Sequence, residues 1–133
     1  MTKRVASSFC TARHKFGKEK EVELLERLQN NLGETINPTE ERFSLKDYTS
    51  KNYNIELKSR RYYKSDKYSE WLVPACKFND ISKPLIIYYF WDGDQTLWRY
   101  DYNLDDKKDF TFRKSPISNQ DHYDIPKRFF TQV

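Results

Sequence analysis

The sequence has little glycine, little cysteine and no long apolar run, and each shortage excludes a class of protein. Three glycines among 133 residues cannot form a glycine-rich phosphate loop, so ATP-dependent chemistry is not expected. Two cysteines, Cys10 and Cys76, make no disulfide framework, which favours a reducing cytoplasmic or nuclear compartment. Because no signal peptide or membrane span is recognisable, we expect an intracellular protein without a membrane partner.

Charged and aromatic residues are abundant instead. Charged residues make up 33% of the chain and aromatic residues 17%, and an aromatic content this high argues against disorder. Residues 1–20 carry six basic side chains and one acidic side chain, and residues 58–67 carry five basic side chains and one acidic. Such clusters suit a polyanionic partner such as nucleic acid, although solvated surface lysines give the same pattern.

The first periodic segment predicts a helix over residues 16–32, with Gly33 in the position of a C-terminal cap. At 100° per residue three leucines form one apolar stripe, Leu25, Leu28 and Leu32. Glu21 lies at the centre of the same stripe. A carboxylate on a buried face needs a counter-charge or a metal, so Glu21 is a candidate functional residue.

The rest of the chain predicts an α/β fold around a central mixed sheet of about four to five strands flanked by helices. Expected strands are 42–47, 53–61, 85–91, which is apolar on both faces, 96–102 and an edge strand at 110–113. A short helix capped by Ser65 or Asp66 could precede Pro74. We expect one domain over 1–133, with a basic arm (1–14), a core (16–102) and a C-terminal edge strand with an irregular segment (103–133).

The candidate site lies on the strand 53–61. Ile55 and Leu57 alternate with Glu56 and Lys58, so the two charged side chains share the face opposite the apolar residues. The turn-forming residues 49–52 separate this strand from Asp47, so a tight bend could bring Asp47 beside Glu56. Two carboxylates and a lysine can hold Mg²⁺ and activate a water. Alternatively, Glu56 and Lys58 form the solvated face of a half-buried strand and Asp47 is a turn residue.

Asp47, the triplet Glu56-Leu57-Lys58 and the segment Gly17-Lys-Glu-Lys-Glu21 together resemble the PD-(D/E)XK nuclease superfamily. Within that superfamily the chain is most similar to small Holliday-junction-resolvase-like or phage and virus-type endonucleases. Lys46 stands where the family's name has proline. The resemblance covers roughly residues 16–102 and implies a restriction-endonuclease-like core.

The resemblance also implies a role for each residue. Asp47, Glu56 and the backbone carbonyl of Leu57 would coordinate Mg²⁺, with Mn²⁺ able to replace it. Glu21 would reach the metal directly, through a water or at a second ion. Lys58 would orient the attacking water, help to deprotonate it or stabilise the developing charge. The sequence leaves open whether one metal ion or two would bind.

Basic residues next to the strand are the expected nucleic-acid contacts: Arg60, Arg61 and Lys64 first, then Lys77, Arg13, Lys15 and Lys18. Tyr62, Tyr63 and Tyr68 could stack on bases or sugars. We expect a Mg²⁺-dependent endonuclease that cleaves DNA, with selectivity for branched or junction DNA. Because minimal domains of this superfamily commonly work as homodimers, the resemblance also implies a homodimer. The alternatives are an RNA endonuclease with the same metal site, a non-catalytic nucleic-acid-binding module of the same fold, and an interaction protein with an aromatic surface.

Overall fold

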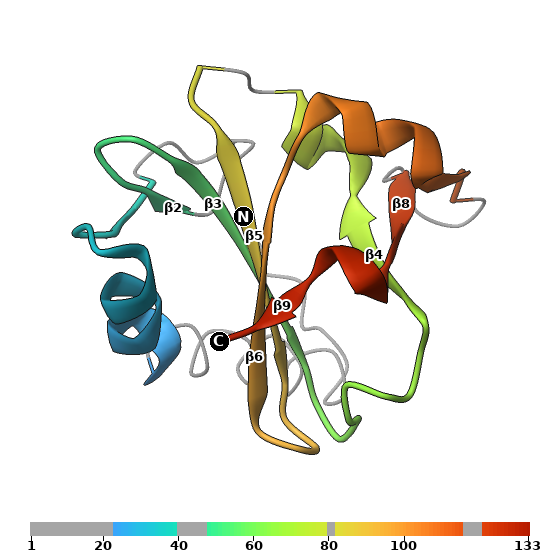
Figure 1. Cartoon of the computed structure of the whole chain (residues 1–133), viewed down its shortest axis with the longest axis horizontal. Helices are drawn as coiled ribbons and strands as arrows, with labels where there is room; N and C mark the ends of the chain where they lie inside the picture. The colour runs from blue at the N-terminus through green and yellow to red at the C-terminus, as the bar shows by residue number, and fades with distance from the viewer. Residues whose placement is uncertain (1–22, 40–47, 80–81, 116–120) are drawn as a thin grey trace, which may run out of the picture.

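The computed structural model describes residues 23–39, 48–79, 82–115 and 121–133, which form a helix at 23–32 and two β-sheets (Figure 1). The larger sheet has six strands in the order β1-β2-β3-β5-β6-β9, and the smaller sheet has three in the order β4-β8-β7. The larger sheet contains β1 (Asn37–Pro38), β2 (Tyr48–Thr49), β3 (Asn54–Arg60), β5 (Leu85–Trp91), β6 (Thr96–Asp101) and β9 (Thr131–Gln132). The smaller sheet contains β4 (Glu70–Pro74), β7 (Thr111–Arg113) and β8 (His122–Pro126). Three 3-10 helices complete the described elements, η1 (Ala75–Phe78), η2 (Leu104–Asp109) and η3 (Lys127–Phe129).

The larger sheet is mixed, so the protein is an α/β protein as predicted. β3 and β5 pair in parallel from Asn54↔Leu85 to Arg60↔Trp91, whereas the other neighbouring strands of this sheet pair antiparallel. All seven residues of β5 are buried, which confirms the prediction of a central strand from its continuous apolar run. A parallel pair needs a long crossover, and here the crossover contains β4 and η1.

The helix covers one face of the larger sheet (Figure 1). Leu24 and Leu28 pack there in a core with Ile55 and Leu57 of β3. The helix ends as predicted, because Gly33 has a positive φ of 78° and its N–H donates to the Gln29 carbonyl at 2.8 Å.

A polar contact ties the end of the helix to the sheet. The Tyr88 hydroxyl donates to Asn31 Oδ1 at 2.7 Å, and Arg99 Nη1 donates to the same oxygen at 2.8 Å. Burial raises the pKa of Tyr88 to about 12, with the Arg99 charge opposing this shift, so the hydroxyl remains a donor at neutral pH.

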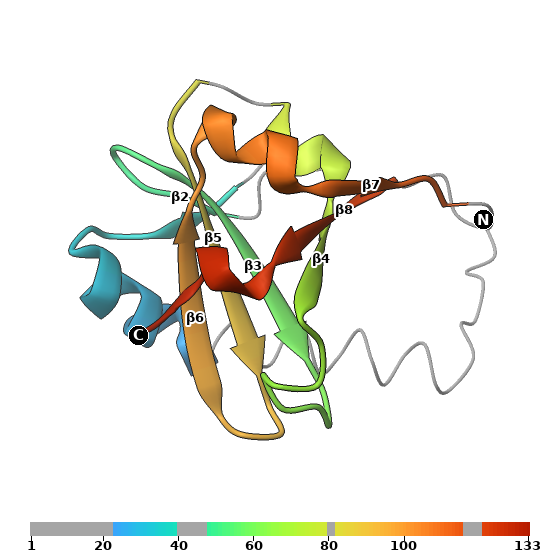
Figure 2. The ribbon, with the colours of Figure 1, turned by 45° about the vertical axis from the view of Figure 1, so that its right-hand side comes forward.

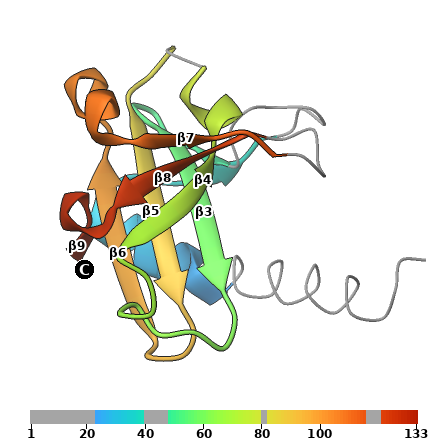
Figure 3. The same ribbon diagram turned by 90° about the vertical axis from the view of Figure 1, so that its right-hand side faces the viewer.

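The smaller sheet covers the opposite face of the larger one (Figures 2 and 3). Trp71 of β4 lies at the centre of the aromatic core between the two sheets. Its ring centroid is 5.0 Å from that of Tyr89, 5.1 Å from Trp91 and 4.7 Å from Phe130. Aromatic rings at these distances add specific edge and tilt contacts to their large buried area.

Two sequence predictions of the fold are wrong, and the structure decides one segment that the sequence left open. The larger sheet has six strands rather than four to five, because the two-residue strands β1, β2 and β9 are too short to show periodicity. The segment before Pro74, where the sequence left a short helix open, forms β4, since Trp71 and Val73 alternate toward the aromatic core. The C-terminal segment predicted to be irregular forms β8, η3 and β9.

The predicted flanking helices are also only partly present, because within the described residues one α-helix covers one face and a second sheet covers the other. The predicted edge strand is present as β7, at the edge of the smaller sheet. The predicted strand at 42–47 and the first part of the predicted helix, with Gly17 and Glu21, lie outside the described residues.

Candidate functional site

Strand β3 carries the predicted catalytic pair on the face that the smaller sheet covers. Ile55 and Leu57 belong to the core on the helix side, which confirms the predicted alternation. Because side chains alternate along a strand, Glu56, Lys58 and Arg60 point toward the smaller sheet. Glu56 is opposite Ile87 and Arg60 is opposite Trp91 in the parallel pairing with β5. The second sheet therefore encloses a face of β3 that would otherwise meet solvent.

Glu56 is a buried carboxylate, with only 2% of the residue exposed. Its Oε1 lies 3.2 Å from the Nζ of Lys77, which η1 supplies at the end of the crossover. The Lys77 side chain is itself 14% exposed, so both charges of the ion pair are largely removed from water. A buried carboxylate requires such a counter-charge. Lys77, predicted as a nucleic-acid contact, thus lies against Glu56.

Strands β2 and β3 form an antiparallel hairpin beside Glu56. Tyr48 pairs with Ile55, so β2 begins opposite the residue that precedes Glu56. Ser50 closes the turn, since its N–H donates to the Tyr53 carbonyl at 2.9 Å and its Oγ accepts from the Tyr53 N–H at 3.1 Å. The predicted tight bend between the two strands is therefore present.

Several predicted site residues lie outside the described residues: Asp47, Glu21, Arg13, Lys15 and Lys18. In the described parts of the chain, no three or more His, Cys, Asp or Glu side chains are grouped so that they could hold a metal ion. The described members of the predicted metal set are thus Glu56 and Leu57, and Leu57 is 4% exposed.

The predicted phosphate contacts that follow Lys58 are Arg60, Arg61 and Lys64, and each of them has a different environment. Arg60 Nε donates to the Tyr89 hydroxyl at 3.0 Å, and that hydroxyl donates to the Leu72 carbonyl at 3.1 Å. Burial raises the pKa of Tyr89, and the Arg60 charge opposes this shift. The Arg61 guanidinium lies 4.8 Å from the Tyr62 ring centroid, and Lys64 is exposed.

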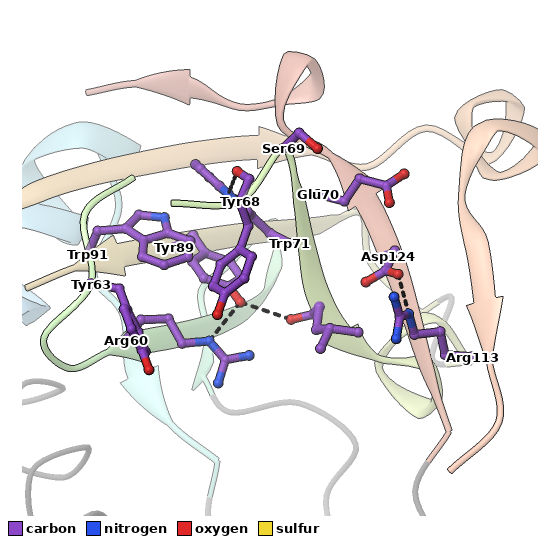
Figure 4. A pocket seen from close by; sticks show the side chains of 11 residues that line it. Arg60, Tyr63, Tyr68, Ser69, Glu70, Trp71, Tyr89, Trp91, Arg113 and Asp124 are labelled. Carbon is purple, nitrogen blue, oxygen red and sulfur yellow. Dashed lines mark hydrogen bonds and ion pairs between the residues drawn. The ribbon is translucent and has the colours of Figure 1, made fainter. Parts of the chain in front are cut away.

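Arg60 lines a pocket of about 420 Å³ between the end of β3 and the smaller sheet (Figure 4). Tyr63, Trp91 and Arg60 lie on one side of this pocket, and the ion pair of Arg113 and Asp124 lies on the other side. The remaining lining residues are Tyr68, Ser69, Glu70, Trp71, Leu72 and Tyr89. The pocket thus combines aromatic walls with two guanidinium groups and two carboxylates.

The turn between β5 and β6 fixes the loop that carries Tyr63. The Gly93 N–H donates to the Tyr63 carbonyl at 2.8 Å, and a Cβ on Gly93 would lie only 2.5 Å from the Tyr63 carbonyl carbon. Only glycine allows this approach of the two backbones.

Asp94 of the same turn holds the loop through its carboxylate, which accepts from the Ser65 N–H at 3.0 Å and the Ser65 hydroxyl at 2.7 Å. Burial acts to raise the pKa of Asp94, but these bonds and one from Thr96 outweigh it and lower that pKa.

Sequence reasoning missed the pocket residues contributed by the smaller sheet, above all Glu70, Arg113 and Asp124. Asp124 is 4% exposed, and its partner Arg113 comes from the neighbouring strand β7. The sequence of residues 122–126, where Ile125 follows Asp124, has the pattern of a buried strand. That pattern does not indicate which strand this segment pairs with.

Comparisons of the chain with protein-family models, with curated proteins and with solved structures find no match. None of the helices in the described ranges is long and apolar enough to cross a membrane.

Proposed function

We propose that the protein is a Mg²⁺-dependent nuclease that hydrolyses DNA phosphodiester bonds, with selectivity for branched or junction DNA. The observation that supports this most is the position of Glu56. It is a buried carboxylate on β3, it shares a strand face with Lys58, and it directly follows Ile55, which pairs with Tyr48 at the start of β2. Buried ionisable groups grouped in this way are typical of functional sites.

In this proposal Asp47 and Glu56 supply the carboxylate oxygens that Mg²⁺ prefers, and the Leu57 carbonyl and Glu21 complete the set. Mn²⁺ would serve in its place. When bound there, the metal ion would polarise the phosphate and activate a water. Lys58, two residues further along the same face, would stabilise the negative charge that develops on the phosphate.

Lys77 is part of this proposal as the counter-charge of Glu56 in the metal-free protein. Its ammonium group lies 3.2 Å from the carboxylate, on a flexible four-carbon stem from η1. A divalent cation at Glu56 would take over the role of that ammonium, which could then turn toward the phosphate backbone. Lys77 would thus link metal binding to nucleic-acid binding.

The same ion pair favours a second candidate function, a nucleic-acid-binding module without turnover. Lys77 already neutralises the charge of Glu56 without a metal, at a distance of 3.2 Å. The basic residues 58–67 and the exposed tyrosines would then bind nucleic acid on their own.

A cleavage assay separates the two functions. The pure protein is incubated with duplex, single-stranded and four-way-junction DNA and with RNA, in Mg²⁺, Mn²⁺ or EDTA, beside Asp47→Asn, Glu56→Gln and Lys58→Met. Lys108→Met, which removes an exposed lysine of η2, is the matched control. We expect metal-dependent cleavage of DNA by the wild type and the control, and a loss of about 100-fold or more in the site variants.

The remaining outcomes assign the alternatives. Cleavage kept by all three site variants would refute the site, and preferred cleavage of RNA would make the protein an RNA endonuclease. Binding without cleavage in either metal would favour the binding module. A homodimer, which we also propose, would give twice the chain mass of 16.2 kDa in light scattering.

A further inference from the structure

We propose that the pocket between the end of β3 and the smaller sheet binds one unpaired nucleotide of a nucleic acid strand, with its base against Tyr68 and its phosphate on Arg60. This inference rests on the proposed function and deepens it, because it names strands with unpaired bases as the substrate class. Binding to the pocket itself requires neither a metal nor cleavage.

The shape and walls of the pocket suit a planar ligand. The cavity of about 420 Å³ lies within the range of small-ligand pockets. Tyr63 and Tyr68 stand at its opening with 45% and 49% of each residue exposed, and their ring centroids are 6.1 Å apart at an angle of 70°. Tyrosine residues this exposed beside a cavity can stack on a nucleobase of any sequence.

Arg60 supplies a site for phosphate at the aromatic side of the pocket. Its Nε donates a hydrogen bond to the Tyr89 hydroxyl, which holds the side chain in place, and its guanidinium extends toward the middle of the pocket (Figure 4). Within the described residues, neither Nη group has a hydrogen bond to a protein acceptor. A fixed guanidinium with two nitrogens available matches the bidentate geometry of a phosphate.

The other side of the pocket is unsuited to phosphate and suited to the edge of a base. The charge of Arg113 is neutralised by Asp124, and Glu70 adds an exposed carboxylate. Ser69 and Glu70 lie together at this edge (Figure 4), where they offer a hydroxyl donor and a carboxylate acceptor. This asymmetry sets the orientation, with the phosphate toward Arg60 and the base edge toward Glu70.

Trp91 adds a further ring to the aromatic side of the pocket. It lines the pocket with 1% of the residue exposed, and its ring centroid lies 6.5 Å from that of Tyr68.

The pocket also lies in line with the proposed catalytic residues. Arg60 is two residues beyond Lys58 on the same face of β3, which places their backbones roughly 7 Å apart. A strand whose phosphate rests on Arg60 would therefore continue along β3 toward Lys58 and Glu56. A duplex would first have to unpair and unstack a base, which costs free energy, so a strand with unpaired bases should bind more tightly.

Fluorescence anisotropy in EDTA tests the pocket apart from cleavage. The probes are labelled oligothymidylate, oligouridylate and a blunt duplex, with the wild type, Arg60→Ala, Tyr68→Ala and Tyr68→Phe. Arg128→Ala is the matched control for charge, since Arg128 is exposed, is paired with Asp109 and does not line the pocket. Comparison of the two single strands decides between DNA and RNA as the source of the nucleotide.

We expect the single strands to bind at least about 5-fold more tightly than the duplex, and Arg60→Ala and Tyr68→Ala to weaken single-strand binding by at least about 5-fold. Tyr68→Phe keeps the ring and should bind as the wild type does. In a Trp98→Phe background, where both remaining tryptophans line the pocket, a single strand should also quench the intrinsic fluorescence.

Equal binding of duplex and single strands, or losses in Arg60→Ala and Tyr68→Ala no larger than in Arg128→Ala, would overturn the pocket assignment even if the protein cleaves DNA. Pocket-dependent binding of single strands without cleavage in any metal would keep the assignment and refute the nuclease.

Discussion

Replacing Lys77 by methionine should destabilise the protein strongly at neutral pH and by only about 1 kcal/mol at pH 5. The substitution keeps the volume of the side chain but removes the ammonium that lies 3.2 Å from the buried Glu56 carboxylate. The variant can leave Glu56 charged and without this partner, or protonate it. Whichever state costs less free energy sets the loss of stability.

The magnitude follows from these two costs. At an effective dielectric constant of about 20, a pair at this distance attracts by about 5 kcal/mol, and breaking a buried ion pair typically costs about 3–5 kcal/mol. Protonating a glutamate with an ordinary pKa near 4.3 costs about 3.7 kcal/mol at pH 7 and about 1 kcal/mol at pH 5. The expected loss is therefore about 3–4 kcal/mol at pH 7, or roughly 10–15 °C in Tm for a chain of this size.

The sign of the pH dependence is fixed by proton binding. Above pH ~4.3 the folded variant holds a proton on Glu56 that the unfolded chain does not, so its stability relative to the wild type falls as the pH rises, by about 1.4 kcal/mol per unit. Urea unfolding at several pH values measures this slope. The double variant Lys77→Met/Glu56→Gln should remove it, and Lys108→Met, at an exposed lysine, should stay within about 0.5 kcal/mol of the wild type.

The same variant reports on the proposed metal. Mg²⁺ at 100 times its Kd would add about 2.7 kcal/mol to the stability of Lys77→Met, and it would add nothing to the double variant, which has lost the Glu56 charge. A loss below about 1 kcal/mol at pH 7 without pH dependence would refute the view that Lys77 is the main counter-charge of Glu56. Equal effects of Mg²⁺ on both variants would place the metal elsewhere.

Three further predictions concern the turn beside the pocket and the docking of the helix. Gly93→Ala should lower the free energy of unfolding by about 2 kcal/mol or more in urea titrations, because its Cβ would meet the Tyr63 backbone at 2.5 Å. Gly33 has a φ of 78° and open space around it, so Gly33→Ala should lower that free energy by only about 1–2 kcal/mol. Asp94 has a lowered pKa in the folded protein, so its contribution to stability is complete above the unfolded pKa of about 3.9 and is lost as the pH falls through the folded pKa. The difference in stability between the wild type and Asp94→Asn should therefore shrink in acid titrations below about pH 4. A constant difference would contradict this. Tyr88→Phe removes the 2.7 Å hydrogen bond to Asn31 and should cost about 1 kcal/mol, with faster hydrogen exchange confined to the helix at 23–32; unchanged exchange there would mean that the bond does not hold the helix.

Local patterns in the sequence were sufficient for the elements with a clear period. The continuous apolar run of β5 predicted a buried central strand, and the alternation in β3 predicted which residues face the helix. Gly33 marked the end of the helix, because a positive φ there is a local property of the backbone. The smaller sheet could not be predicted in the same way. Its strands are short, and they become strands because β4 and β8 pair with each other over a separation of about fifty residues.

The sequence by itself determined that Glu56 and Lys58 share one face of β3, because alternation is a property of any extended chain. Only the tertiary structure decided what that face meets. The smaller sheet encloses it, η1 brings Lys77 to within 3.2 Å of Glu56, and β4, β7 and β8 complete the pocket around Arg60. These partners lie far apart in the sequence and are brought together by packing around Trp71, a contact between two sheets that no local pattern records.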